Sequence, residues 1–178
     1  MRGGEVVDGL DHLVDACAEL LDAELPAMVA AGAPDVVLAM VTLIDVVDRV
    51  WVEGEEPLTA TVDRFVDRLS AEYTLATQRL LDEGVGKVLW VAPPVPELPP
   101  AGAMARAVDP LIRQRYREVL AGLESTFPGR AVVVDLAAWM ASAADPPDRK
   151  DGLHYSEGGA RELADRYLGP VVVAEAVS

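Results

Sequence analysis

Three short apolar segments constrain the fold of this chain more than any other feature of its sequence. Each is a mostly apolar run of strand length, and the first is of the kind that is buried on both faces in a parallel sheet. The runs are Val36 to Val41, Val88 to Ala92 and Ala131 to Asp135. Segments with helical spacing of apolar residues alternate with them, and the short connections imply parallel strands joined by right-handed crossovers. The sequence therefore predicts a three-layer α/β fold.

The helical segments have identifiable starts and ends. Two proline-containing passages, residues 93–100 and 145–150, interrupt the pattern and are predicted to be surface loops. The first predicted helix runs from Glu5 to about Val29 with a bend near Pro26, and the second from about Thr59 to Leu81 with Gly84 as the stop. The third begins at the Asp109-Pro110 cap pair and ends at Leu123, and a short helix follows the third strand. The last begins after the Ser156 cap and ends at Leu168, before Pro170.

Composition and charge exclude several classes of function. The 178 residues are 51% hydrophobic, which is enough to bury one core and predicts a single domain over residues 1–178. The 15 basic and 30 acidic residues give a net charge of -15, which repels nucleic acid and anionic lipid surfaces.

Cys17, His12 and His154 are the only cysteine and histidines, too few for a structural zinc site, so neither a metal nor another cofactor is predicted. Without a membrane-spanning run or a signal peptide, the chain as written is predicted to be cytoplasmic; an upstream start with a signal or membrane domain would place it outside.

The segment Asp151-Gly-Leu-His154 carries the clearest chemical signal. A carboxylate three residues ahead of a histidine can accept the Nδ1 proton of the imidazole and leave Nε2 free as a general base. This is two thirds of a hydrolytic triad. The missing third is a serine on a sharp turn after an early strand, and no serine occurs before Ser70.

Other polar residues are predicted to meet this pair at one edge of the sheet, because ligands of parallel α/β sheets bind at the carboxyl ends of the strands. Asp45 and Asp48 follow the first apolar run, Pro93 to Pro96 follow the second, and the segment 151–154 comes after the third. Asp45 and Asp48 can bind a cation or a substrate hydroxyl, or they can form a structural ion pair with Arg49.

At this point the residues resemble those of a known family. The block from Asp151 to Ala160 and the helix after it are similar to the last conserved block of the SGNH (GDSL-type) hydrolases, and the three strands stand in that family's order. The resemblance extends from Cys17 onward and is greatest to a bacterial subgroup, found as free domains or linked to membrane acyltransferases, in which an Asp-Arg pair such as Asp48-Arg49 follows the first of these strands. It implies a flavodoxin-like α/β/α sandwich that hydrolyses or transfers a small acyl ester, such as an acetyl ester of a carbohydrate, with Asp151 as the acid and His154 as the base.

Two departures from the family pattern shape the prediction. The Gly-Asp-Ser block that supplies the nucleophile has no counterpart between Met1 and Asp35, so the serine and its strand are expected upstream of Met1 and the domain is expected to be incomplete at its N-terminus. The family's Gly-x-Asn-Asp block aligns with residues 42–45 and has Ile44 in place of the asparagine that donates to the oxyanion. Thr42 and Asp45 are the remaining candidates on the oxyanion or substrate side.

Two functions of different classes stay open. One is an SGNH-type esterase or O-acyltransferase, and the other is a non-catalytic binding or assembly module that has kept the fold and lost the nucleophile. In the family the serine-bearing strand pairs with the strand that is Val36 to Val41 here, so the 178 residues alone would leave one edge of that strand unpaired. We expect the N-terminal helix or a second copy of the chain to cover it, the latter giving a homodimer.

Overall fold

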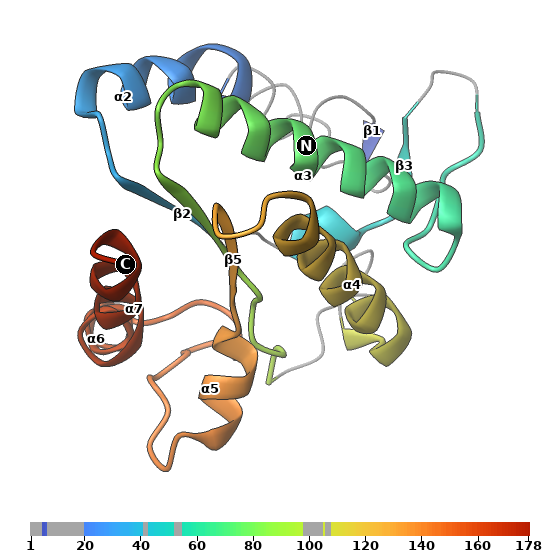
Figure 1. Cartoon of the computed structure of the whole chain (residues 1–178). Coiled ribbons are helices and arrows are strands. Elements are labelled where there is room, and N and C mark those ends of the chain that lie inside the picture. The colour runs from blue at the N-terminus through green and yellow to red at the C-terminus, as the bar shows by residue number, and fades with distance from the viewer. Residues whose placement is uncertain (1–4, 7–19, 41–42, 52–54, 98–104, 106–107) are drawn as a thin grey trace.

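The chain folds around a parallel sheet of three strands flanked by helices. We describe residues 5–6, 20–40, 43–51, 55–97, 105 and 108–178 of a computed structural model (Figure 1). The strands are β2 (Val36–Met40), β4 (Lys87–Val91) and β5 (Ala131–Val134), in the order β2-β4-β5. The register places Leu38 beside Leu89, and Leu89 beside Val132. The prediction of an α/β fold with parallel strands is confirmed.

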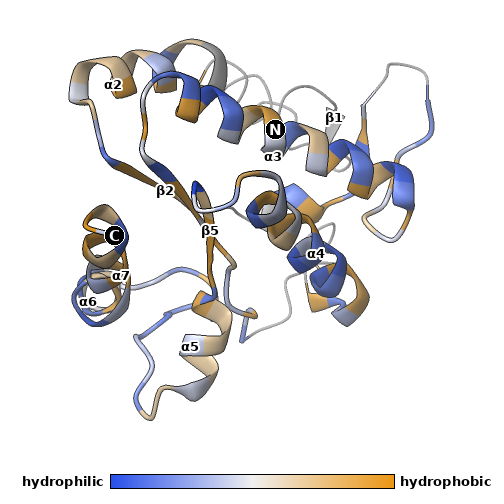
Figure 2. Cartoon of the chain, in the orientation of Figure 1, coloured by the Kyte–Doolittle hydropathy of each residue, from blue (hydrophilic) through white to orange (hydrophobic). Residues whose placement is uncertain are grey.

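The central strand β4 is buried on both faces because its side chains alternate between two apolar clusters. Val88 and Trp90 belong to the cluster that includes apolar residues of α3 (Asp63–Asp82) and α4 (Pro110–Thr126). Leu89 and Val91 belong to the cluster that includes residues of α5 (Leu136–Ser142) and of the C-terminal helices. Figure 1 shows the sheet between these two groups of helices, and Figure 2 shows that its strands are among the most hydrophobic segments. Trp90 is buried, as predicted for the apolar run from Val88 to Ala92.

The strand β2 differs from its prediction. Its first four residues are only half-buried, and Met40 at its end is 52% exposed. The reason is its position at the edge of the sheet, since β2 pairs with β4 on one side and no other strand of the described residues pairs with it. An apolar run of this kind does not distinguish a central strand from an edge strand.

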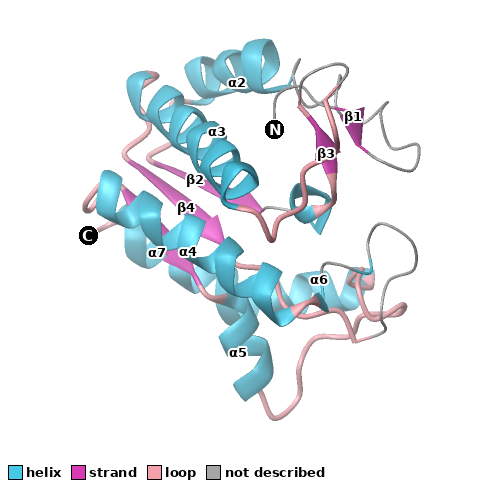
Figure 3. Ribbon diagram, turned by 90° about the vertical axis from the view of Figure 1, so that its right-hand side faces the viewer, coloured by secondary structure: helices cyan, strands magenta, loops and turns pink. Residues whose placement is uncertain are grey.

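The N-terminal segment is only partly helical, which corrects the predicted helix from Glu5 to Val29. Its first two described residues form β1 (Glu5–Val6), which pairs antiparallel with β3 (Arg49–Val50) in a separate two-stranded sheet, seen on the right of Figure 3. Helical structure is described from a π-type turn, η1 (Leu20–Glu24), and continues as α2 (Leu25–Gly32). The positions of His12 and Cys17 lie outside the described residues.

Two of the predicted helix boundaries rest on identifiable caps, and so does the start of the short helix after β5. Asp109 caps α4 by accepting a hydrogen bond from the amide of Leu111 at 2.8 Å. Gly84 follows α3 with a φ of +98°, a conformation that favours glycine and ends the helix. Asp135 caps the short helix α5 after β5. The helix α3 begins at Asp63, four residues after the predicted start, because Val62 is extended.

The C-terminal helix does not stop before Pro170, which corrects the prediction from the sequence. It begins as α6 (Glu157–Leu163), widens into a π-type turn, η4 (Ala164–Leu168), and continues as α7 (Gly169–Ala176). The wide turn makes room for the proline ring, and Pro170 lies in the first turn of α7. A Cβ at Gly169 would lie 2.7 Å from the carbonyl oxygen of Ala164, so the turn also needs glycine there. Within the described residues, no helix has the length and apolar character needed to cross a membrane.

Candidate functional site

The Asp151 to His154 turn holds its two side chains in direct contact. Asp151 Oδ2 lies 2.7 Å from His154 Nδ1, and because an ionised carboxylate only accepts hydrogen bonds, Nδ1 is the donor. The other carboxylate oxygen, Oδ1, accepts the amides of Leu153 at 2.9 Å and His154 at 2.6 Å. One oxygen of Asp151 therefore closes the turn while the other orients the imidazole. The contact predicted from the sequence is present.

Electrostatics keep the carboxylate of this pair charged. The hydrogen bond from the His154 side chain, followed by the two backbone amides, holds the pKa of Asp151 well below its usual range. The His154 side chain is 77% exposed, and its Nε2 has no hydrogen-bond partner among the described residues. A neutral imidazole held in this way presents an Nε2 lone pair toward solvent, which is the arrangement a general base requires.

A buried arginine ties this turn to the loop after β4. The Arg149 side chain is 5% exposed and donates to the carbonyl oxygen of Val95 at 2.9 Å and to Glu97 Oε1 at 2.7 Å. The Glu97 amide in turn donates to the carbonyl oxygen of Gly152 at 2.9 Å. These three bonds join residues 95–97 to residues 149–152 and so connect the second and third segments predicted at this edge, Pro93 to Pro96 and 151–154. No sequence signal identified Arg149, because its partners lie more than 50 residues away.

The start of α6 fixes the other side of the turn. Ser156 caps this helix by accepting a hydrogen bond from the amide of Gly159 at 3.0 Å, as predicted. Its own amide donates to the carbonyl oxygen of Asp148 at 3.1 Å. Gly159 packs so closely here that a Cβ would lie 2.4 Å from the same carbonyl oxygen. The helix start and the segment before the turn therefore form one tightly packed unit.

Asp45 takes part in a buried polar network and not in the Asp151–His154 pair. It lies in a 3₁₀ turn, η2 (Leu43–Val46), after β2, and its Oδ2 accepts a hydrogen bond from the hydroxyl of Tyr73 at 2.7 Å. That hydroxyl lies 3.0 Å from the hydroxyl of Tyr116. Because Tyr73 donates its only proton to the carboxylate, Tyr116 donates to Tyr73. The network connects the loop after β2 to α3 and α4.

Burial shifts the acidity of both phenols in this network. Desolvation, and then the negative charge of Asp45, raise the pKa of Tyr73 well above its usual value. The same two causes raise the pKa of Tyr116. Both hydroxyls therefore stay protonated throughout the physiological range and act as fixed hydrogen-bond donors. No sequence signal identified the partners of the Tyr73 hydroxyl.

Thr42, the other predicted candidate on the oxyanion or substrate side, lies outside the described residues. Three serines that were not predicted to be site residues form hydrogen bonds elsewhere. The hydroxyls of Ser125 and Ser142 donate to helix carbonyls, and that of Ser156 is the cap described above. In the part of the chain that the structure describes, no hydroxyl is hydrogen-bonded to His154, and no group of three or more His, Cys, Asp or Glu side chains is placed to hold a metal ion.

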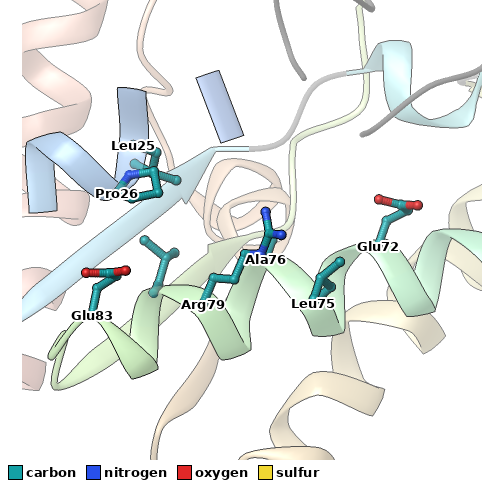
Figure 4. A pocket seen from close by; sticks show the side chains of 8 residues that line it. Leu25, Pro26, Glu72, Leu75, Ala76, Arg79 and Glu83 are labelled. Atoms are coloured by element: carbon teal, nitrogen blue, oxygen red, sulfur yellow. The ribbon is translucent and has the colours of Figure 1, made fainter. Parts of the chain in front are cut away.

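Two small hollows near the sheet are too small to hold a substrate. One lies between α2 and α3, where Leu25, Pro26 and Leu75 line it (Figure 4). The other lies at the carboxyl end of β4, beside Ala92 and Tyr116. Each has a cavity volume of about 20 Å³, which is room for about one water molecule.

Comparison of the sequence with protein-family models and with curated proteins gives no match.

Proposed function

We propose that this chain belongs to an SGNH-type serine ester hydrolase or O-acyltransferase, in which His154 is the general base and Asp151 orients it. The observation that carries the proposal is the 2.7 Å contact between Asp151 Oδ2 and His154 Nδ1 in a turn that leaves Nε2 toward solvent. The substrate class is a small acyl ester, for example an acetyl ester of a carbohydrate.

The position of the pair in the fold supports this function. The Asp151–His154 turn follows β5 in the chain and is bonded to the loop at the carboxyl end of β4. In the SGNH family the serine-bearing strand lies beside the strand that corresponds to β2, and β2 is an edge strand here. We propose that a strand from outside the 178 residues pairs along this edge, completes a flavodoxin-like sandwich and brings its serine to the rim.

The chemistry then needs only the two residues described and that serine. The serine Oγ attacks the carbonyl carbon of the ester while its proton passes to His154 Nε2. The imidazolium then gives this proton to the departing alcohol oxygen as the ester C–O bond breaks, which leaves an acyl-serine. Water or a second alcohol then attacks the acyl carbon and passes its proton to His154 Nε2, and the imidazolium returns this proton to the serine Oγ as the acyl-serine bond breaks. Asp151 accepts the hydrogen bond from Nδ1 throughout. Backbone amides stabilise the oxyanion.

An N-terminally extended chain provides the direct test. We expect the extended protein to hydrolyse p-nitrophenyl acetate, and the 178-residue chain to show little turnover. His154→Gln in the extended protein should lower kcat/KM by about 10²–10⁴-fold, the usual contribution of a general base. His12→Gln is the matched control because it removes the only other histidine, and it should leave the rate unchanged. Equal turnover by the short chain, or no loss in the His154 variant, would refute the assignment.

Asp151→Asn gives a sharper test of how the carboxylate acts. The amide oxygen can keep accepting the backbone amides of Leu153 and His154, while the NH₂ group faces Nδ1 and reverses the imidazole tautomer. We therefore expect the fold to persist and kcat/KM to fall at least about 10²-fold. Imidazole ¹⁵N NMR of the 178-residue chain should show the proton on Nδ1 of neutral His154 in the native protein and on Nε2 in the variant. The tautomer could change as expected while the extended protein with its native Asp151 shows no turnover. In that case the carboxylate orients the imidazole but the pair is not catalytic, and the chain is a non-catalytic binding or assembly module.

A further inference from the structure

A long groove runs between α4 and α5, separate from the Asp151–His154 turn. Its volume is about 890 Å³, in the size range of sites for small organic ligands. Four alanines of the two helices line it, with Val108 and Pro110 where α4 begins and Val95 from the loop after β4. The α4 residues that line it span Pro110 to Ala121, which is a length of roughly 16 Å along a helix. Figure 3 shows α5 extending away from the sheet beneath α4.

Two arginines on one side of α4 supply positive charge to this groove. Arg113 and Arg117 are one helical turn apart, and both also line the small hollow at the carboxyl end of β4, beside Ala92 and Pro93. The guanidinium groups therefore stand where the groove meets the rim of the sheet. This is the edge at which ligands of parallel α/β sheets bind.

Arg113 forms no direct ion pair with a carboxylate in the described part of the chain. Arg117 pairs with Asp135 at 3.2 Å, whereas Arg113 reaches only the carbonyl oxygen of Pro93, at 3.5 Å. Burial, and then the charge of Arg117, lower the pKa of Arg113, and the opposing effect of Asp135 is smaller. Glu118 also lines the groove and accepts a hydrogen bond from Gln114 at 2.9 Å. An anion beside Arg113 would relieve the repulsion between the two guanidinium groups.

We propose that the α4–α5 groove binds an anionic amphiphile, with its carboxylate or phosphate head on Arg113 and Arg117 and its apolar chain along the alanines. A guanidinium binds such heads with two parallel hydrogen bonds. The net charge of -15 repels anions from an acidic surface, so a site for an anion needs a local pair of positive charges such as this one. Binding needs no nucleophile and is therefore independent of ester chemistry.

Calorimetric titration of the 178-residue chain tests the groove. We expect one saturable site for octanoate or for octyl phosphate, and the ligand with the lower Kd identifies the preferred head group. Octanol has the chain without the charge, while acetate and inorganic phosphate have the charge without the chain. All three should bind at least about tenfold more weakly, the effect of losing roughly 1.4 kcal/mol of binding free energy. Failure of both charged amphiphiles to bind at millimolar concentrations would overturn the proposal.

Substitutions locate the site. Arg113→Gln should weaken binding about tenfold, the expected effect of losing a charged hydrogen bond. Arg161→Gln is the matched control, since Arg161 pairs with Glu157 on the exposed side of α6, and it should leave binding unchanged. Ala138→Leu narrows the groove without changing its charge and should also weaken octanoate binding. Equal loss in the Arg161 and Arg113 variants, or full binding by the Arg113 and Ala138 variants, would place the ligand elsewhere.

Discussion

Tyr73→Phe tests the buried network that connects the loop after β2 to α3 and α4. The substitution removes one oxygen and leaves the ring, which stacks on Trp90 with centroids 4.6 Å apart. It deletes the hydrogen bond to Asp45 at 2.7 Å and the acceptor of the Tyr116 hydroxyl at 3.0 Å. A hydrogen bond to a charged group contributes about 1.5–3 kcal/mol and a neutral one about 1 kcal/mol. Because Asp45 is only partly buried, water can replace part of the first bond, and we expect a loss of about 2 kcal/mol.

Tyr116→Phe is the matched control for this prediction. It removes the neutral bond alone and leaves the bond from Tyr73 to Asp45 in place, so it should cost about 1 kcal/mol. Urea unfolding followed by far-UV circular dichroism measures both variants, because Trp90 fluorescence would respond to the substitution at Tyr73 itself. A Tyr73→Phe variant within about 0.5 kcal/mol of the wild type, or a costlier Tyr116→Phe, would refute the reasoning.

The same network predicts how stability depends on pH. The pKa of both phenols is raised in the folded chain, so their contribution is fully present below the unfolded value of about 10 and is lost as pH rises above it. Between the pKa of the unfolded chain and the higher pKa of the folded chain, each tyrosine lowers the free energy of unfolding by up to about 1.4 kcal/mol per pH unit. The cost of Tyr73→Phe should therefore shrink above about pH 10, because the variant has one such group fewer. A cost that is independent of pH would mean that the hydroxyl is not desolvated.

Two further predictions concern the turn that carries the candidate base. His154→Gln removes the main cause of the lowered pKa of Asp151, so carboxyl ¹³C NMR should show the Asp151 pKa rising toward about 3.9; an unchanged pKa would assign the shift to the backbone amides instead. Gly159→Ala places a Cβ 2.4 Å from the carbonyl oxygen of Asp148 and should lower the free energy of unfolding by about 1–3 kcal/mol. Gly158→Ala places its Cβ 4.0 Å from the Ser156 hydroxyl and should leave the stability unchanged or raise it by up to about 1 kcal/mol. Equal costs for the two glycine variants would contradict the close packing.

Local interactions explain which parts of this structure could be predicted from the sequence. Asp151 and His154 are three residues apart, and their contact depends on a single turn, so the sequence is enough to predict it. Arg149 and Tyr73 reach partners 52 and 28 residues away. Such contacts depend on how loops and helices pack, which periodicity does not specify. Periodicity places Tyr73 on the buried side of α3 but says nothing about where its hydroxyl goes.

The errors in the predicted fold have the same origin. The run from Val36 to Val41 is apolar enough for a central strand, yet burial depends on how many neighbours the sheet provides, and β2 has a described partner on one side only. Pro170 predicts a helix end wherever the preceding turn is a regular α-helix. Here the wide turn η4 removes the clash between the proline ring and the preceding turn. Neither a sheet edge nor a local change of helical winding leaves a pattern in the apolar residues.

The outer edge of β2 connects the proposed activity to the oligomeric state. Its backbone groups can pair with a serine-bearing strand or with β2 of a second copy, but not with both at once. An unpaired apolar edge favours association with another chain. Among the described residues no strand pairs with this edge, so we expect the 178-residue polypeptide to dimerise in light-scattering measurements. A chain extended by the proposed serine-bearing strand should be monomeric, because that strand would occupy the edge. Met40→Lys places a charge at the exposed end of β2 and should weaken the dimer, whereas Met28→Lys on α2, which is 64% exposed in the native chain, should not. A monomeric short chain at all concentrations, or a dimer that is insensitive to both substitutions, would show that the β2 edge is not the surface that pairs.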